Sequence, residues 1–313
     1  MWPADRHGIV DRSAVLAAGS SERALSAAVK AGLLLVVGRG KYVPREAVAE
    51  RKDAAAVLYR AKCFAAATGP RAMVLSHESA AAVHGLALLY PDNSRVHMTN
   101  GQPDGGYNQV RRAVHAGVLA DDEIAEVDGV LVTSVVRTVV DLALAAGHFA
   151  QALTAFDVGL ASRIVLEDRA ALRDEMARAL ASSRRGVALA RRALSFADGG
   201  AESPGESWSR AQIIDAGLPV PDLQVRYRLR SGRTAFCDFG TRGKFVGEFD
   251  GLVKYRREMR HGESPEEVVI REKIREDELR DLGLNVARWV WEDLRTGRVV
   301  SIVRSHYEDV GIL

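Results

Sequence analysis

Two carboxylates, two glycines and a lysine occur within nine residues, GEFDGLVKY, at positions 247–255. Glu248 and Asp250 are two residues apart in a strand-like stretch, and a strand places such residues on one face. Neighbouring carboxylates repel one another unless they share a proton or a positive charge lies between them. The spacing therefore raises the question of which positive group accompanies Glu248 and Asp250.

A third carboxylate lies in the strand-like stretch TAFCDFG, residues 234–240. Alternation along a strand turns Cys237 and Phe239 to one face and Asp238 to the other. If this strand and the next form a hairpin through the turn TRG, Asp238 approaches Glu248. The sequence thus predicts that the carboxylates converge at one rim of a sheet.

The candidate metal ligands are therefore Asp238, Glu248 and Asp250. Hard oxygen ligands with open water positions suit Mg²⁺ or Mn²⁺. Such an ion would activate water and stabilise charge on a phosphate under attack. Lys254 lies just beyond and is a candidate to orient the water or to neutralise the transition state. The alternative is an exposed acidic edge with no cation.

Glu206 has two competing interpretations. In the stretch Ser203-Pro204-Gly205-Glu206 it fits a capping box, in which the glutamate folds back to the start of the helix. Alternatively, its carboxylate points at the rim of the sheet and adds another acidic ligand. Both interpretations stay open at this level.

These residues belong to the last of three regions expected in the 313-residue chain. The stretch ADGGAESPG, residues 197–205, is a break in composition and the main expected boundary. Beyond it the pattern predicts a helix, three strands, a helix capped by Ser264, a strand and a last helix. The middle region is mixed α/β and carries no catalytic signal, so it is a candidate surface for a partner protein. The expected domains are 1–50, 51–196 and 197–313.

The composition narrows the class of protein. Apolar residues make up 47% of the chain, enough for real cores, and a net charge of +2 is too weak to indicate nucleic acid by itself. Cys63 and Cys237 form no CxxC pair, so neither a structural zinc nor a disulfide framework is expected. The longest apolar runs are too short to cross a bilayer, and the N-terminus lacks a signal-peptide pattern. The expected compartment is the cytoplasm.

The first 50 residues are predicted to form two helices and a hairpin. SAVLAAG (13–19) and SSERALSAAVKAG (20–32) each end in glycine, a residue typical of helix ends. LLLVVGRGKYV (33–43) reads as two strands around a glycine turn. This order resembles a winged helix-turn-helix.

One face of the second predicted helix has the composition of a DNA-reading surface. Helical spacing turns Ala24, Leu25, Ala28 and Val29 inward. The outer face carries two cations, a hydroxyl and nothing bulky, so it can enter a major groove. The hairpin tip adds two cations suited to phosphate. The alternative is a small helical cap with solvated basic residues. The candidate DNA-binding residues are Arg23, Ser26, Ala27, Lys30, Arg39 and Lys41.

The carboxylate pattern resembles the PD-(D/E)XK restriction-endonuclease-like superfamily, in particular the branch similar to very-short-patch-repair endonucleases. The resemblance rests on the order Glu206, Asp238, Glu248-Phe-Asp250, a helix and then RWVWEDL (288–294). It implies an α/β nuclease domain with Asp238 and Glu248 as metal ligands and Glu206 as the acid from the first helix. The position of the family's lysine holds Asp250, and Lys254 is the candidate for the basic role.

The first part of the chain resembles proteins with an AbiEi-type antitoxin N-terminal domain. The likeness is carried by HGIVDRSAVLAAGSSERALSAAVKAGLLLVVGRGKYVP (7–44), SHESAAAVHGL (76–86) and VTSVVRTVVDLA (132–143). It implies a winged-helix DNA binder, often an autorepressor, whose partner in paired systems is a nucleotidyltransferase toxin.

Taken together, the sequence predicts an α+β multidomain protein: a winged helix-turn-helix, a mixed middle domain and a restriction-endonuclease-like α/β domain. The expected function is a DNA-binding autoregulator of AbiEi antitoxin type, with double-stranded DNA as partner and a nuclease-like domain as scaffold. The alternative is an active Mg²⁺-dependent DNA endonuclease targeted by the winged helix. A protein-interaction module built on the middle region is a third possibility.

Overall fold

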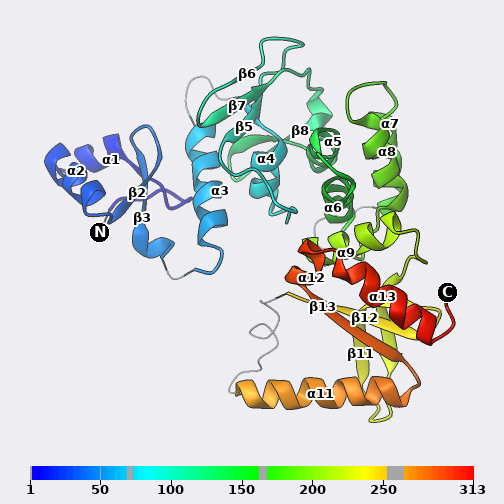
Figure 1. Ribbon diagram of the computed structural model, residues 1–313. Coiled ribbons are helices and arrows are strands. Elements are labelled where there is room, and N and C mark those ends of the chain that lie inside the picture. The colour runs from blue at the N-terminus through cyan, green and yellow to red at the C-terminus, as the bar shows by residue number, and fades with distance from the viewer. Residues whose placement is uncertain (1, 50, 69–72, 162–167, 252–263) are drawn as a thin grey trace. The chain divides into compact units, whose positions relative to one another are not determined.

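The computed structural model describes residues 2–49, 51–68, 73–161, 168–251 and 264–313 (Figure 1). The chain forms two compact units, Met1–Leu142 and Ala143–Leu313. The described residues combine helices with sheets of three, six and four strands, so the α+β class is confirmed. Within the described residues, no helix has the length and apolar character needed to span a membrane.

The N-terminal unit begins with two short helices and a hairpin. Asp11 and Ser21 cap the two helices by accepting hydrogen bonds from the backbone of the first turn. Leu25 and Ala28 of the second helix are buried in a small core with Val10 and neighbouring apolar side chains. The strands pair antiparallel in the order β1-β3-β2. The elements are β1 (Val10–Asp11), α1 (Arg12–Ala17), α2 (Glu22–Lys30), β2 (Leu34–Gly38), β3 (Lys41–Pro44) and a 3₁₀ turn (Arg45–Ala47).

A mixed sheet in the order β6-β7-β5-β4-β9-β8 and three helices complete this unit. The helices are α3 (Ala54–Ala67), α4 (His77–His84) and α5 (Val135–Ala145), and a 3₁₀ turn covers Asp121–Glu123. The strands are β4 (Val74–Leu75), β5 (Val96–Thr99), β6 (Tyr107–Asn108), β7 (Arg112–His115), β8 (Ile124–Val127) and β9 (Val130–Thr133).

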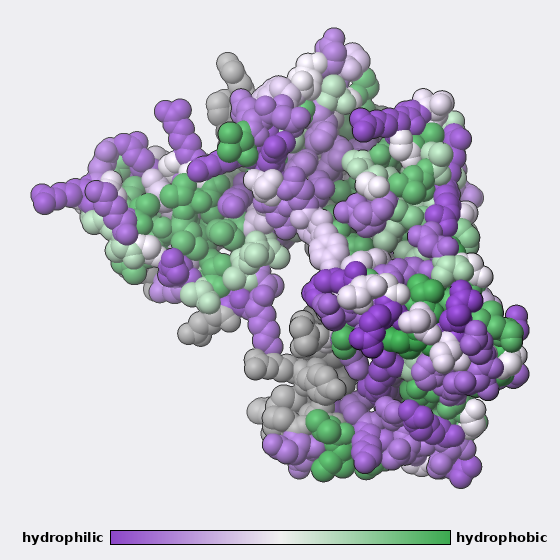
Figure 2. Space-filling view, viewed as in Figure 1, coloured by the Kyte–Doolittle hydropathy of each residue, from purple (hydrophilic) through white to green (hydrophobic). Residues whose placement is uncertain are grey.

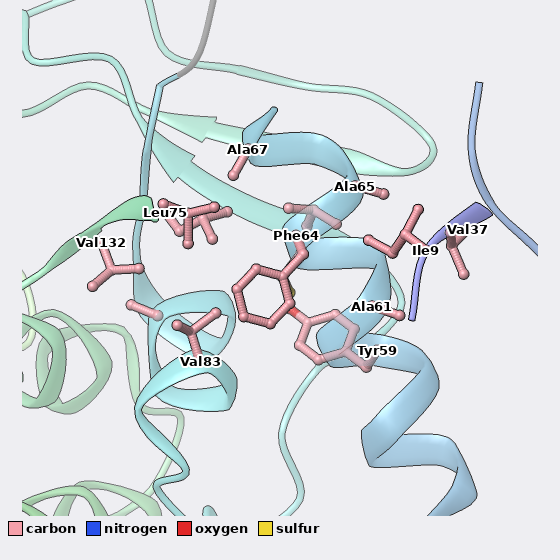
Figure 3. Close-up of a cluster of buried hydrophobic side chains, with 14 of the residues drawn as sticks. Ile9, Val37, Tyr59, Ala61, Phe64, Ala65, Ala67, Leu75, Val83 and Val132 are labelled. Carbon is pink, nitrogen blue, oxygen red and sulfur yellow. The ribbon is translucent and has the colours of Figure 1, made fainter. Parts of the chain in front are cut away.

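The expected boundary at residue 50 does not separate two cores. One hydrophobic core joins Val37 of β2 to Phe64 of α3 and to Leu75 of β4. Figure 3 shows α3 between Ile9 and Val37 on one side and Leu75 on the other. The small sheet therefore buries its second face against α3, and residues 1–50 and the segment after them share one core.

The C-terminal unit combines a four-stranded sheet with helices that precede and follow it in the chain. Its first helices are α6 (Phe149–Leu160), α7 (Arg169–Ala179), α8 (Val187–Phe196) and α9 (Pro204–Asp215). The sheet follows the order β10 (Asp222–Arg228), β11 (Thr234–Thr241), β12 (Phe245–Asp250) and β13 (Asn285–Val290). The remaining helices are α11 (Pro265–Asp281), α12 (Trp291–Arg295) and α13 (Arg298–Asp309).

The expected boundary at residue 197 also falls inside a compact unit. Asp157 of α6 and Arg210 of α9 form a buried ion pair at 3.0 Å, with 1% and 5% of their side chains exposed. The Asp157 carboxylate also accepts a hydrogen bond from the backbone N–H of Asp198. The composition break at 197–205 is therefore a connection held against α6, and α6 packs in the same unit as the sheet.

Helices cover both faces of the four-stranded sheet (Figure 1). Leu279 of α11 packs with Val246 and Val286 on one face, whereas Ile213 of α9 and Val303 of α13 pack in the cluster on the other. Strands β11 and β12 form the expected hairpin, and β12 pairs parallel with β13.

The predicted orientation of two side chains on β11 is wrong. Cys237 and Phe239 were expected to point the same way, but they lie in different hydrophobic clusters, Cys237 near Leu279 and Phe239 near Trp289. On the neighbouring strand, Gln224 has a φ of 50°. The register puts Gln224 opposite Asp238, between the paired residues on either side. Such an irregularity interrupts simple alternation along a strand.

Candidate nucleic-acid interface and acidic cavity

The outer face of α2 carries the candidate DNA-binding side chains. Arg23, Ser26, Ala27 and Lys30 are all exposed, whereas Leu25 and Ala28 are buried beneath them. Ala24 was expected to face inward, but it is exposed. Figure 2 shows hydrophilic side chains protruding at the left edge of the view, over α1 and α2.

The hairpin tip contains one exposed cation and one that is already bound. Arg39 is exposed in the turn between β2 and β3. Gly40 follows with a φ of +68°, a conformation that glycine adopts without strain. Lys41 instead donates a hydrogen bond to Thr68 Oγ1 at the end of α3. Of the two hairpin cations, Arg39 is the better placed for phosphate.

In the C-terminal unit the expected carboxylates do converge. A cavity of about 460 Å³ is lined by Asp238, Glu248 and Asp250. The register places Asp238 opposite Glu248, one step beyond the paired residues Phe239 and Gly247. The rest of the lining consists of Glu202, Gln224, Thr234, Ala235, Phe236, Glu272, Arg275 and Arg288.

Glu248 is bound by two arginines. Its carboxylate accepts hydrogen bonds from Nη2 and Nη1 of Arg275 on α11, at 2.6 and 3.1 Å. Nη2 of Arg288 on β13 lies 3.4 Å from the same carboxylate. Burial by itself lowers the pKa of Arg275, but the hydrogen bonds and charge of Glu248 outweigh it and raise that pKa. The positive groups between the carboxylates are therefore guanidinium groups.

The other two carboxylates also have partners among the described residues. Asp250 Oδ2 lies 3.5 Å from Nη1 of Arg288. Asp238 Oδ2 accepts a hydrogen bond of 2.9 Å from the backbone N–H of Phe249. Arg288 also contacts Glu272 and Glu276 of α11, at 3.5 and 3.1 Å.

This arrangement does not fit a divalent cation. In the described part of the chain no group of three histidine, cysteine, aspartate or glutamate side chains is placed to hold a metal ion. Both oxygens of Glu248 face Arg275, so a cation at that carboxylate would have to displace a bidentate guanidinium. Metal-dependent activity of this cavity stays a prediction.

Glu206 takes the capping position at the start of α9. Its carboxylate accepts hydrogen bonds from Ser203 Oγ at 2.7 Å and from the backbone N–H of Glu202 at 2.8 Å. Its own N–H donates to Ser203 Oγ. The side chain is buried, and in the described residues Glu202 rather than Glu206 lines the cavity. Of the two interpretations of Glu206, the geometry favours a capping role at the start of α9, with the carboxylate bound to the N–H of Glu202 rather than to that of the N-cap residue Ser203.

Lys254, the candidate for the basic role, lies outside the described residues. The residues that sequence reasoning missed are Arg275 and Arg288. Arg288 is paired in parallel register with Glu248, and it opens the RWVWEDL segment already noted for its family resemblance. Alternation in the predicted strand 284–291 would have placed Arg288 on the face of Val286, which is a usable signal.

The first part of the N-terminal unit has the element order of a winged helix-turn-helix: two helices joined by a tight turn, then a hairpin. Residues 3–45 match the family described as "Transcriptional regulator, AbiEi antitoxin". The match therefore covers both helices and the hairpin, so the chain carries an AbiEi antitoxin-type domain at its N-terminus.

Two curated relatives are similar to part of the chain. Both are uncharacterized proteins of Mycobacterium tuberculosis, one from strain CDC 1551 / Oshkosh and one from strain H37Rv. Each is 33% identical over 141 residues, which is 44% of this chain and 49% of the relative. The matched stretch thus spans about half the length of the relatives.

Proposed function

We propose that the protein is a DNA-binding transcriptional regulator of AbiEi antitoxin type, which reads double-stranded DNA with α2 and contacts phosphate with the hairpin. The observation that carries the proposal is the exposed face of α2, with Arg23 and Lys30 at its ends and Ser26 and Ala27 between them. The family match over residues 3–45 supports the same assignment.

The chemistry of this face suits a major groove. Arginine can form a bidentate contact with guanine, and small residues beside it allow the helix to approach the base edges. Ser21 caps the helix by accepting a hydrogen bond from the N–H of Ala24, which stabilises the first turn of α2 around Arg23. Arg39 in the hairpin supplies a phosphate contact beside the helix. Phosphate contacts make the affinity depend strongly on salt.

The test is DNA binding by the full chain, measured by fluorescence anisotropy on a duplex that covers the region upstream of its own gene. Arg23→Ala is expected to weaken binding about 5- to 150-fold, the effect of losing one base contact of about 1–3 kcal/mol. Arg304→Ala on α13 is the matched control, because Arg304 is an exposed arginine of the other unit. Equal affinity of wild type and Arg23→Ala would refute the assignment of α2.

A nucleotidyltransferase toxin is the proposed protein partner, because paired systems of this antitoxin type contain one. Co-expression with the neighbouring gene and purification on a tag carried by this chain tests the pairing. A stable complex supports the partnership, and separate elution of the two proteins contradicts it. The proposal that α2 binds DNA does not depend on this result.

The alternative function, a Mg²⁺- or Mn²⁺-dependent DNA endonuclease, would use Asp238, Glu248 and Asp250. One observation favours it: the cavity is lined by five carboxylates and two arginines, so acidic groups are in excess. The bidentate Arg275 contact with Glu248 argues against it. Incubation of the full chain with plasmid or single-stranded DNA and Mn²⁺ tests this alternative. Cleavage that Asp238→Ala abolishes would establish the nuclease.

A further inference from the structure

The acidic cavity has its own source of positive charge on two neighbouring elements. Arg275 approaches Glu248 from α11, and Arg288 approaches it from the adjacent strand β13. Arg288 cannot be far from Glu248, because the parallel register of β12 and β13 pairs these two residues directly. The contact is thus built into the sheet and does not depend on a surface rotamer alone.

The groups in this network are largely removed from water. The side chains of Glu248 and Arg275 are 7% and 18% exposed, and that of Arg288 is 25% exposed. A charge of this burial is strongly unfavourable unless an opposite charge and hydrogen bonds accompany it. Arg275 also donates a hydrogen bond to the carbonyl oxygen of Phe236 on β11. Each charge in the network therefore depends on the others.

The same network attaches α11 to the sheet. Glu272, Arg275 and Glu276 all lie on α11, and Arg288 contacts the carboxylates of both Glu272 and Glu276. Among the large apolar side chains of α11 that the structure describes, Leu279 is buried, whereas Val269, Ile270 and Ile274 are exposed. Ionic contacts accordingly carry much of the docking of α11.

We infer that Arg275 and Arg288 are permanent counter-ions of this carboxylate cluster and replace the divalent metal that the PD-(D/E)XK-like pattern calls for. The C-terminal unit then keeps its cavity and its docked α11 without a metal ion. A metal would have to compete with a bidentate arginine for Glu248, and the release of that arginine would leave a buried guanidinium without its partner. The cavity is in this sense a metal-independent structural site.

The two possible counter-charges predict stability changes of opposite sign. If arginines neutralise Glu248, then Glu248→Gln leaves Arg275 buried and poorly paired, and the melting temperature of the full chain in EDTA falls by about 5–10 °C. If a metal ion is instead the counter-charge of the cluster, Glu248→Gln relieves repulsion between carboxylates in the metal-free protein. The melting temperature in EDTA then stays the same or rises. Glu292→Gln is the matched control, because Glu292 pairs with Arg295 on the surface and is expected to change little.

A second measurement covers the case in which Glu248→Gln does not fold. Calorimetric titration of the wild-type full chain with Mn²⁺ is expected to show no site in the micromolar range, and millimolar Mg²⁺ is expected to leave the melting temperature unchanged. A single Mn²⁺ site that Asp238→Asn removes would overturn the inference, as would a Glu248→Gln protein that melts at or above wild type. These results do not depend on DNA binding by α2, so the inference and the proposed function can fail separately.

Discussion

The two units of the chain handle charge in opposite ways. On α2, Arg23 and Lys30 are exposed cations at the ends of a face that buries only Leu25 and Ala28 beneath it. In the C-terminal cavity, Glu248 is buried and held by Arg275 and Arg288. Cations that remain exposed on a small-residue face are available to an external anion, whereas buried charges need partners inside the fold. The contrast supports the proposed DNA binding by the first unit and the inferred ionic structural role of the cavity in the second.

The largest expected effect is a loss of folding stability without a loss of DNA affinity. Arg275→Met removes the bidentate partner of Glu248 and should reduce the free energy of unfolding by about 3–5 kcal/mol, because a buried carboxylate loses its main counter-charge. DNA affinity measured on the folded variant should match wild type. Urea unfolding and anisotropy on the same preparation check both parts. An Arg275→Met variant as stable as wild type would contradict the structural role of the ionic network. A variant that folds but loses DNA affinity would contradict the separation of DNA binding from this network.

Acid should destabilise the N-terminal unit through three histidines. The rings of His77 and His115 stack at 3.8 Å, and His97 Nδ1 lies 3.0 Å from His115 Nε2, with Glu78 3.6 Å from His97. Burial lowers the pKa of all three, that of His115 to about 4, and the charges of the neighbouring histidines lower the values for His77 and His115 further.

Because these folded-state pKa values lie below the unfolded value of about 6.5, the unfolded chain binds more protons as the pH falls. Stability from this cluster is complete above about pH 6.5 and is lost between there and about pH 4, by up to about 1.4 kcal/mol per pH unit for each extra proton. Urea unfolding across this window, with His115→Gln as the variant and the exposed His148→Gln as control, measures the slope. A slope that His115→Gln leaves unchanged would rule out the cluster as its source.

The smallest expected effect compares two lysines of the DNA-binding region. Lys30→Ala should weaken binding and reduce the slope of log affinity against log salt by about 1, the effect of one lost phosphate contact. Lys41→Ala should have a smaller effect, below about 1 kcal/mol, because Lys41 already donates to Thr68. Anisotropy titrations at several salt concentrations rank the two variants. The reverse ranking would assign the phosphate contact to Lys41 rather than to Lys30.

Local patterns were sufficient to predict most elements of the N-terminal helices and hairpin. Helical spacing identified the exposed face of α2, and the glycines marked the ends of the helices and the turn at Gly40. Local patterns could not predict that the core of the N-terminal unit extends beyond the hairpin to α3. Val37 and Phe64 share a core through the second face of the small sheet, and that contact depends on how α3 packs.

In the C-terminal unit, strand alternation correctly brought Asp238, Glu248 and Asp250 to one cavity. The counter-charge was missed because it comes from other elements. Arg288 meets Glu248 only through the parallel pairing of β12 and β13, and Arg275 only through the position of α11. Neither pairing nor helix docking is encoded in local periodicity, so a pattern of acids alone indicated a metal where the fold supplies arginines.

The most direct test of this division is DNA binding by the full chain in EDTA. Wild type should bind the upstream duplex in EDTA, and Asp250→Asn should match the wild-type affinity both in EDTA and in millimolar Mg²⁺, whereas Arg23→Ala should bind more weakly than wild type in both. Binding that requires Mg²⁺, or that Asp250→Asn abolishes while Arg23→Ala retains it, would contradict the assignment of recognition to α2.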